Sequence, residues 1–502
     1  MSRPVPLRGV IEGFYGPVWS HDSRLEVIDF VGARGMNAYV YAPKSDPKHR
    51  EVWREPYDRA EIARFAELAA RCDAGGVRLG FAISPGLDIT YEADEDRGAL
   101  VAKLLPLLDA GIDWFVIAVD DIPNRPGLAA DQAALTTWLA RELRERRADT
   151  RCSLVPTEYV GTRPSAYLGT LAHQLPLDID VFWTGPTVCS PTITAEDARA
   201  WRDAIGARPL LLWDNYPVND AVMERELHLG PYRGRDPELS DVVDGVLCNP
   251  MLQPRASLVA LGTAAEYLRD PGTYQECEAW ERAIEDAGGA NAKSLRALAR
   301  ACCDGPLAEP AMLPAAPLVD AVDATTDGPD WAAPVTAVRN ELLALRDAAR
   351  TWDATTDPLA EEVAPWLEQA RREADAGLAA LRLLQQTHLV GAVDSADRPG
   401  GLGPDPESAM IHAFALLFAW SAARDAPPRV VLGPRFALHP AVVQRSDGAP
   451  ALDVGLALRE DASLVDRLAR VALARYSRVM RADTIEESRS EPAPPFPDAR
   501  LA

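Results

Sequence analysis

The chain has 502 residues, a formal net charge of −23 and an apolar fraction of 47%. This length exceeds that of one ordinary hydrophobic core, so we expect at least two domains. The excess of acidic residues excludes nucleic acid and anionic membranes as expected partners, because proteins bind phosphate groups with clusters of Lys and Arg.

The N-terminal residues and the cysteines predict a cytoplasmic protein without a metal or another cofactor. Residues 1–8 contain no apolar segment of the kind found in secretory signals, and no apolar run approaches the roughly 18–20 residues of a membrane span. The seven cysteines are odd in number and form no C-x-x-C pair, and the seven histidines are scattered. The sequence leaves the oligomeric state open.

The first half of the chain alternates short apolar runs with helical segments. Each run is rich in Val, Ile, Phe and Leu, ends in polar residues and recurs every 27–41 residues, as strands do in a barrel. Nearly continuous apolar strands are typical of parallel strands that are buried on both faces. The eight predicted strands are Gly9–Phe14, Asn37–Pro43, Arg78–Pro85, Trp114–Asp121, Ser153–Tyr159, Asp180–Pro186, Pro209–Tyr216 and Gly245–Pro250.

The segments between these strands have helical periodicity. Asp58–Ala74 and Ala130–Arg146 each place apolar residues on one face, and Ala256–Leu268 follows the eighth strand as a last helix. We therefore predict an α/β fold in which residues 5–272 form a (β/α)₈ TIM barrel.

The sequence pattern of residues 273–480 predicts an all-helical C-terminal domain. The apolar stripes of these helices favour a bundle core, and an exposed groove for a partner is the alternative. A passage rich in Pro and Asp covers residues 304–334, and residues 481–502 have a composition typical of disorder. The predicted helices are Glu276–Ala299, Val335–Thr351, Pro365–Gln386, Ser408–Ala423 and Ala462–Met480.

Polar residues follow every predicted barrel strand. Barrel enzymes carry their chemistry at the C-terminal ends of the strands, so these side chains are expected to share one rim. No glycine-rich phosphate loop and no metal-ligand spacing is present in the sequence. Carboxylates, amides and aromatic rings remain, which suit acid–base catalysis, sugar hydroxyls and the apolar faces of sugar rings.

The adjacent carboxylates Asp120 and Asp121 are the sharpest chemical feature. Two carboxylates at one buried strand end repel each other, so their pKa values should separate. One group should stay ionised, and the pKa of the other should be raised. A turn or a helix cap is the alternative, because Asp-Asp pairs are common in loops. A conventional retaining glycosidase places its two carboxyl groups about 5–5.5 Å apart across the scissile bond. Neighbours on one strand cannot easily do so, and they favour a mechanism in which the substrate supplies the nucleophile.

Nine blocks of sequence occur in order through residues 7–268, at every strand end. The blocks are Gly9–Gly16, Tyr39–Lys44 with Trp53–Pro56, Ser84–Ile89, Asp120–Ile122, Pro156–Tyr159, Phe182–Pro186, Trp213–Asn215 through Asp220, Gly230–Arg235 and Asn249–Pro250. Together these blocks resemble glycoside hydrolase family 84, which includes O-GlcNAcases and enzymes called hyaluronidases.

The resemblance implies a role for each matched residue. Asp120 would orient the 2-acetamido group of the sugar through its N–H, and Asp121 would be the general acid and later the general base. Tyr159 would support the acetamido carbonyl. The remaining substrate-binding residues would be Gly13, Lys44, Thr184, Trp213, Asn215, Asp220 and Asn249, with Thr184 and Trp213 as walls of the acetamido cavity.

Several of these residues have structural alternatives. Glu12 and Asp214 are expected to brace the mouth of the barrel rather than to bind substrate. Lys44 could be part of a structural ion pair, Asn249 could form a turn before Pro250, and Trp183 is expected to pack.

The sequence as a whole predicts a retaining exo-β-N-acetylglucosaminidase that acts on a GlcNAc-bearing glycoside or glycoprotein through an oxazoline intermediate. A non-catalytic GlcNAc sensor, or a scaffold that works through the helical domain, is the first alternative. An endo-acting enzyme on a glycosaminoglycan is the second, and the charge of −23 disfavours it because it would repel a polyanion.

Overall fold

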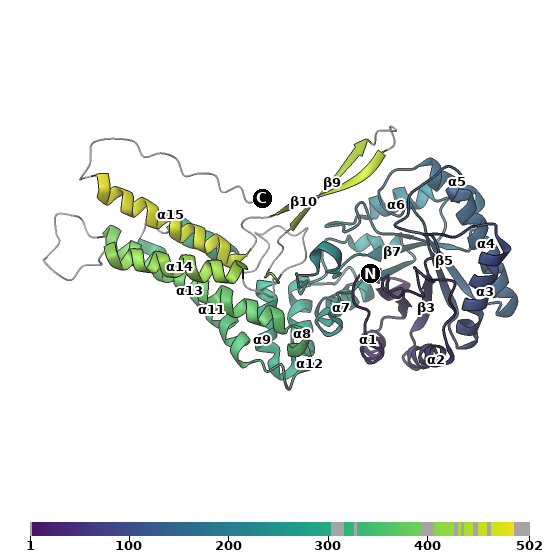
Figure 1. Cartoon of the computed structure of the whole chain (residues 1–502), viewed down its shortest axis with the longest axis horizontal. Coiled ribbons are helices and arrows are strands. Elements are labelled where there is room, and N and C mark those ends of the chain that lie inside the picture. Colours follow the sequence, from purple (N-terminus) through teal and green to yellow (C-terminus); the bar gives the residue numbers. More distant parts are fainter. Residues whose placement is uncertain are drawn as a thin grey trace.

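The computed structural model describes residues 3–302, 316–325, 329–392, 406–425, 430–432, 436–444, 450–458 and 463–485. The first half of the chain forms a barrel surrounded by helices, and the second half forms an elongated group of helices beside it (Figure 1). Each half has its own hydrophobic cluster, and a further cluster joins the two.

Eight parallel strands close into a barrel in sequence order, as predicted. The first strand pairs with the eighth, with Leu7 opposite Gly245, which completes the ring. Every strand is almost fully buried, as expected for parallel strands that are covered on both faces. The strands are β1 (Leu7–Glu12), β2 (Ala38–Tyr41), β3 (Arg78–Ile83), β4 (Trp114–Ala118), β5 (Arg151–Val155), β6 (Asp180–Trp183), β7 (Leu210–Asp214) and β8 (Gly245–Cys248).

Helices follow the strands and form the outer layer of the barrel. The start of the second helix illustrates the local signals: Asp58 accepts hydrogen bonds from the backbone of Ala60 and Glu61, and Glu61 binds back to the backbone of Asp58. Two short 3₁₀ helices, Ala221–Met223 and Pro237–Asp241, lie between β7 and β8. The outer helices are α1 (His21–Ala33), α2 (Arg59–Ala74), α3 (Asp94–Asp109), α4 (Leu128–Arg146), α5 (Ala166–Gln174), α6 (Ala195–Ala204) and α7 (Pro254–Arg269).

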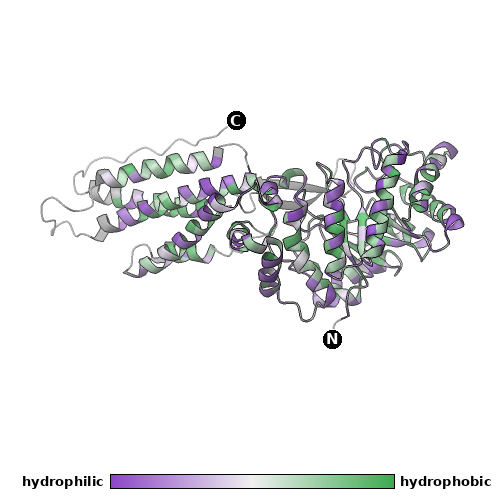
Figure 2. Cartoon of the chain, turned by 90° about the horizontal axis from the view of Figure 1, so that it is seen from below, coloured by the Kyte–Doolittle hydropathy of each residue, from purple (hydrophilic) through white to green (hydrophobic). Residues whose placement is uncertain are grey.

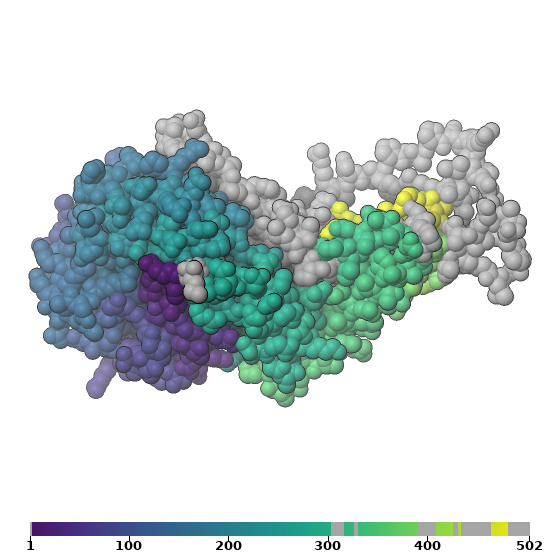
Figure 3. Space-filling model, turned by 180° about the vertical axis from the view of Figure 1, so that it is seen from behind, coloured from purple at the N-terminus to yellow at the C-terminus, as the bar shows by residue number. Residues whose placement is uncertain are grey.

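The two ends of the barrel segment meet in space. Figure 3 shows the purple N-terminal residues directly against the teal segment that contains β8 and α7. Apolar side chains fill the interior of the barrel, among them Ile11, Val116 and Leu247. This packed interior leaves the strand ends as the place for a site.

The C-terminal half is built from helices, as predicted, with one antiparallel strand pair in addition. The helices show hydrophilic and hydrophobic residues in turn along their length, which is typical of amphipathic packing (Figure 2). The strand pair is β9 (Phe436–Gln444) with β10 (Pro450–Leu458). The helices are α8 (Glu276–Gly288), α9 (Ala292–Ala301), α10 (Ala316–Thr325), α11 (Ala332–Thr351), α12 (Pro358–Glu362), α13 (Ala364–Ala392), α14 (Pro406–Asp425) and α15 (Leu464–Ile485).

Three boundaries in this half differ from the sequence prediction. The single helix expected over Glu276–Ala299 is broken after Gly288, because Gly289 has a positive φ of 50° that a continuous helix does not allow. The passage over 304–334 contains α10 in its described part, and residues 303–315 and 326–328 lie outside the described residues. Helix α15 continues to Ile485, and the rest of the tail predicted to be disordered lies outside the described residues.

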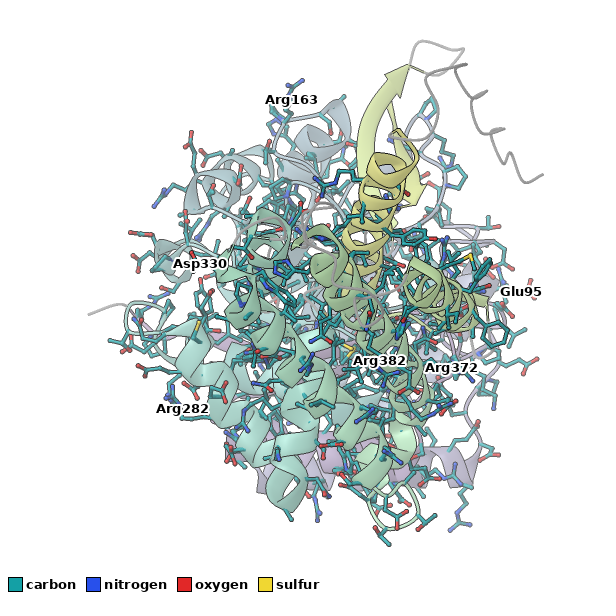
Figure 4. The ribbon with its side chains drawn as sticks, turned by 90° about the vertical axis from the view of Figure 1, so that its left-hand side faces the viewer. Glu95, Arg163, Arg282, Asp330, Arg372 and Arg382 are labelled. Carbon is teal, nitrogen blue, oxygen red and sulfur yellow. The ribbon has the colours of Figure 1, made fainter. Side chains whose placement is uncertain are left out.

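The helical half packs on the loops that follow β7 and β8. Trp366 of α13 donates a hydrogen bond to the backbone oxygen of Arg225, and Trp280 of α8 donates one to that of Leu229. Figure 4 looks onto this half, with Arg282 of α8 on its outer side and Arg372 and Arg382 on α13. The second half therefore buttresses loops at the C-terminal rim of the barrel.

Glu362 of α12 caps a helix of the barrel. Its carboxylate accepts hydrogen bonds from the backbone N–H of Arg255 at 3.2 Å and of Ala256 at 2.7 Å, in the first turn of α7, where Gln253 supplies no side-chain cap. These donors would otherwise lack a partner within the helix. Burial raises the pKa of Glu362 to about 7, and the two N–H donors with Arg255 offset only part of this effect.

Glu362 is expected to make the stability of the protein depend on pH. The pKa of Glu362 in the folded state exceeds the value of about 4.3 for an unfolded glutamate, so the folded state binds this proton more tightly. The resulting stabilisation is complete below about pH 4 and is lost as the pH rises through about 7. Denaturation of the wild type and of Glu362→Gln should be measured at pH 5 and at pH 7.5. From pH 5 to pH 7.5, the free energy of unfolding of the wild type should fall by roughly 1–3 kcal/mol more than that of the variant.

The neighbouring residue offers a matched control. Glu361 is exposed, so Glu361→Gln should leave the pH dependence of the wild type unchanged. Equal pH dependence in the wild type and in Glu362→Gln would show that burial of Glu362 does not favour its protonated form.

Candidate active site

The Asp-Asp pair lies at the C-terminal end of β4. The strand ends at Ala118, and the chain reaches Asp120 and then Asp121, whose φ of 53° is in the left-handed region. Aspartate enters this region more readily than most residues, but the conformation still costs about 1 kcal/mol or more. Such strain at adjacent carboxylates is typical of a functional site.

Asp120 has one oxygen in an ion pair and one without a partner. Lys44, which follows β2, places its Nζ 2.5 Å from Oδ2 of Asp120. The residue is 6% exposed, and its Oδ1 is buried and accepts no hydrogen bond from the described part of the chain. A buried carboxylate oxygen without a donor is costly, so this atom is an acceptor available to a ligand.

Asp121 is held by two phenol groups. Tyr15, which follows β1, donates to Oδ2 at 2.7 Å, and Tyr159, which follows β5, donates to Oδ1 at 2.8 Å. Burial and the charge of Asp121 raise the pKa of both phenols, so both remain protonated donors. Three strands thus bring their ends together around one carboxyl group.

As the general acid that the resemblance implies, Asp121 would be the carboxylate with the raised pKa, and this expectation is wrong for the protein without a ligand. Burial acts to raise the pKa of Asp121, but the charge of Lys44, the hydrogen bonds from Tyr15 and Tyr159 and the charge of Arg50 outweigh it and hold the pKa below its ordinary value. The error arises because the prediction considered the repulsion by Asp120 and not the donors from other strands.

A network of amides lies on the opposite part of the rim. Asn249, after β8, accepts a hydrogen bond from the backbone N–H of Gly13 at 3.1 Å. Its side-chain amide donates a hydrogen bond to Oδ1 of Asn215 at 3.0 Å. Trp213 donates to the same Asn215 oxygen at 3.0 Å. A Cβ at Gly13 would lie 2.0 Å from the ring of Trp213, so only glycine allows the backbone to approach this indole.

Asp220 and Thr184 complete the predicted set. Asp220 accepts the backbone N–H of Tyr15 at 2.8 Å, and burial with the nearby charge of Asp121 raises its pKa. Thr184, after β6, is buried, and its backbone N–H donates to the carbonyl of Tyr159 at 3.0 Å. The Nζ of Lys44 lies 5.5 Å from the centroid of the Trp213 ring, so the amide network and the carboxylate pair are parts of one cluster.

The two carboxylates expected to brace the barrel do so. Glu12 is fully buried, pairs with Arg24 at 2.8 Å and accepts a hydrogen bond from Tyr39. Asp214 pairs with Arg235 and accepts a hydrogen bond from Tyr232.

The structural alternatives for the other residues are decided in part by their contacts. Trp183 is buried, donates to the backbone of Gly161 and packs on Trp201, as a structural residue does. Lys44 forms an ion pair, but its partner is Asp120, so the ion pair belongs to the cluster itself. Asn249 uses its side chain to bind Gly13 and Asn215, which is more than a turn requires.

Two residues around Asp121 had no predicted role. Tyr15 follows a predicted strand, as the other rim residues do, so its position was a usable signal. Arg50 donates to Ser84 at 3.1 Å and to the backbone oxygen of Asp121 at 3.4 Å. It comes from the long loop after β2, where no sequence periodicity indicates the direction of a side chain.

Within the described ranges, no group of three or more His, Cys, Asp or Glu side chains could hold a metal ion. The helices of the same ranges are all too short or too polar to cross a lipid bilayer.

Comparisons with known proteins agree with this geometry. The family model for beta-N-acetylglucosaminidase matches residues 8–300. Protein O-GlcNAcase from Rattus norvegicus and from Mus musculus are each 35% identical over 278 residues, which is 52% of this chain and 30% of those relatives. The chain thus matches less than a third of the length of these curated relatives.

A solved structure extends the likeness over both halves. A mutant of the Thermobaculum terrenum O-GlcNAc hydrolase has a TM-score of 0.75 and 29% identity, and the match covers 96% of this chain and 95% of that one. The family model covers more than half of the residues and includes the entire carboxylate cluster. The chain belongs to the β-N-acetylglucosaminidase family of glycoside hydrolases.

Proposed function

We propose that the protein is a retaining exo-β-N-acetylglucosaminidase that hydrolyses terminal β-linked GlcNAc with the acetamido oxygen of the sugar as nucleophile. In this reaction the acetamido oxygen attacks the anomeric carbon, the bond to the leaving group breaks, and an oxazoline forms. Water then opens the oxazoline with retention of configuration.

The unpartnered oxygen of Asp120 carries the proposal. Lys44 holds one oxygen, and Oδ1 is buried and free to accept a hydrogen bond. An acetamido N–H would satisfy this oxygen, and the bond would strengthen as the nitrogen becomes positive during ring closure. A carboxylate in this position orients the acetamido group and stabilises the transition state.

Both bracing carboxylates are held in ion pairs, which supports a mechanism in which the substrate supplies the nucleophile. Glu12 is engaged by Arg24 and Asp214 by Arg235, so neither is available to attack an anomeric carbon. Asp121 lies beside Asp120 and is the group we assign to protonate the leaving oxygen.

We assign the other rim residues to binding of the sugar. Asp220 and Asn249 would bind ring hydroxyls, and Lys44, Asn215 and the backbone of Gly13 would complete the pocket. Tyr159 would support the acetamido carbonyl by turning its hydroxyl away from Asp121, with Thr184 and Trp213 as walls of the cavity. The support for this assignment is that these groups form one cluster of buried or half-buried side chains with Asp120.

We propose a GlcNAc-bearing glycoside or glycoprotein as the substrate and the cytoplasm as the location. Hydrolysis of an aryl β-N-acetylglucosaminide is the direct test of activity. Release of the phenol with retained anomeric configuration is expected. Binding of a GlcNAc analogue without hydrolysis would identify the protein as a sensor.

A series of substrates with a fluorinated N-acetyl group tests the nucleophile. Fluorine withdraws electrons from the acetamido oxygen, so kcat should fall more than about tenfold from the acetyl to the trifluoroacetyl substrate. Initial rates on a single aryl leaving group measure the effect. A flat series, or a trapped sugar–protein adduct, would falsify the substrate-assisted mechanism.

A further inference from the structure

A buried histidine lies in the segment between β7 and β8, outside the set of residues predicted to act. His228 is 2% exposed and its partner Glu226 is 1% exposed. The Nδ1 atom lies 2.9 Å from the carbonyl oxygen of Pro217 and 2.8 Å from that of Val218. The Nε2 atom lies 3.1 Å from Oε2 of Glu226.

These partners favour the charged form of the ring. A neutral imidazole has one N–H donor and one acceptor nitrogen, whereas an imidazolium donates from both. The partners of His228 are two carbonyl oxygens and a carboxylate, all of which accept hydrogen bonds from an imidazolium. The geometry is therefore that of a buried imidazolium whose charge Glu226 neutralises.

The pair connects two loops of the sugar pocket. The two carbonyls that His228 binds come directly before Asn219 and Asp220 in the chain, and the backbone N–H of His228 donates to the sulfur of Met251, two residues after Asn249. The loop of Asp220 and the loop of Asn249 are thus joined through one residue.

Asn219 makes a second connection between the same loops. Its side-chain amide donates to the carbonyl oxygen of Glu226 at 2.7 Å and to Gln253 at 2.8 Å, and its oxygen accepts the N–H of Leu252 at 2.9 Å. We call Asn219, Glu226 and His228 the inter-loop clamp.

The charge of His228 also acts on Asp220. Burial raises the pKa of Asp220 and the charge of Asp121 raises it further, while the backbone N–H of Tyr15 and the charge of His228 lower it. A charged His228 therefore favours an ionised Asp220, which is the better acceptor for a sugar hydroxyl.

We propose that His228, as an imidazolium paired with Glu226, is a positioning residue that holds Asp220 and Asn249 in the arrangement that binds one sugar. This inference rests on the proposed function, in which these two residues bind ring hydroxyls. Loss of the clamp would weaken sugar binding more than it slows the chemical step, because Asp120 and Asp121 lie on another strand.

Nitrogen NMR of the wild-type protein with labelled histidine tests the charge without reference to activity. His228 is expected to give two protonated ring nitrogens, because both face hydrogen-bond acceptors, and His228→Gln or Glu226→Gln identifies the signal. His49 is an internal control, because burial and then the charges of Lys44, Arg50 and Lys103 lower its pKa well below the ordinary value, so it should stay neutral. A neutral tautomer of His228, with a protonated Glu226 donating to Nε2, would overturn the proposal.

Kinetics test the positioning role. His228→Gln and Glu226→Gln are each expected to raise KM for an aryl β-N-acetylglucosaminide about tenfold, while kcat falls less than about threefold. His21→Gln is the matched control, because His21 forms a half-exposed pair with Glu67 on α2 and should leave both constants unchanged.

An unchanged KM, or a loss confined to kcat, would overturn the positioning role. A wild-type protein that hydrolyses no β-N-acetylglucosaminide would instead contradict the proposed function. In that case the affinity of the same variants for a GlcNAc thiazoline replaces KM as the readout. If these variants fail to fold, the NMR measurement on the wild type decides, with the His228 signal assigned by elimination through substitution of the other six histidines one at a time.

Discussion

Asp121→Ala is expected to lose about 10²–10⁴-fold in kcat/KM on substrates with a poor leaving group, such as an alkyl glycoside or a glycosylated serine. The loss should be less than about tenfold for an aryl glycoside with a phenol of low pKa, because this oxyanion departs without a proton. A slope of log kcat/KM against leaving-group pKa, measured for wild type and variant, displays the difference.

The pH dependence of Asp121 is a second readout of the same variant. A general acid must be protonated, so the activity of the wild type on a poor leaving group should fall as the pH rises through the pKa of Asp121. The hydrogen bonds from Tyr15 and Tyr159 and the charges of Lys44 and Arg50 hold that pKa low in the free protein. A bound sugar would exclude water and take the hydroxyl of Tyr159, so the alkaline limb should lie at higher pH in kcat than in kcat/KM. The limb should vanish in Asp121→Ala.

Equal losses on good and poor leaving groups would show that Asp121 is not the acid. Glu158→Gln is a suitable control, because Glu158 lies next to Tyr159 and forms hydrogen bonds with Asn124 and Ser165 instead of the carboxylate pair.

The barrel could be predicted from the sequence because its signals are local. Each strand is a short apolar run, each outer helix has one apolar face, and Asp58 with Glu61 marks the start of α2 within four residues. The strand-end residues then follow from topology, since parallel strands of a barrel end at the same rim.

The features that escaped prediction depend on contacts between distant residues. Glu362 caps a helix that begins more than a hundred positions earlier, and Arg50 reaches Asp121 from another loop. Strand β9 has Pro440 in its middle, and proline is unusual inside a strand, so the local sequence argued against the strand pair. The pKa of Asp121 was predicted with the wrong sign for the same reason, because its donors come from β1 and β5.

Asp120→Asn is expected to lose about 10²–10³-fold in kcat, by a similar factor for every leaving group. The variant keeps the size of the side chain and removes the charge that Lys44 pairs with at 2.5 Å. The lost interaction is with the acetamido N–H, which becomes more positive during ring closure whichever group departs. The leaving-group slope and the alkaline limb should therefore stay as in the wild type.

The dependence of activity on the leaving group, measured for the two variants, shows which carboxylate has which role. If Asp120→Asn steepens the leaving-group slope and Asp121→Ala does not, the two carboxylates have exchanged roles. If neither variant loses activity, the pair is not catalytic. Lys44→Met adds a further check, because it removes the partner of Asp120 and also the charge that lowers the pKa of Asp121. It should lower kcat for every leaving group, because Asp120 loses the partner that holds it, and it should move the alkaline limb to higher pH, because the pKa of Asp121 loses the lowering effect of Lys44.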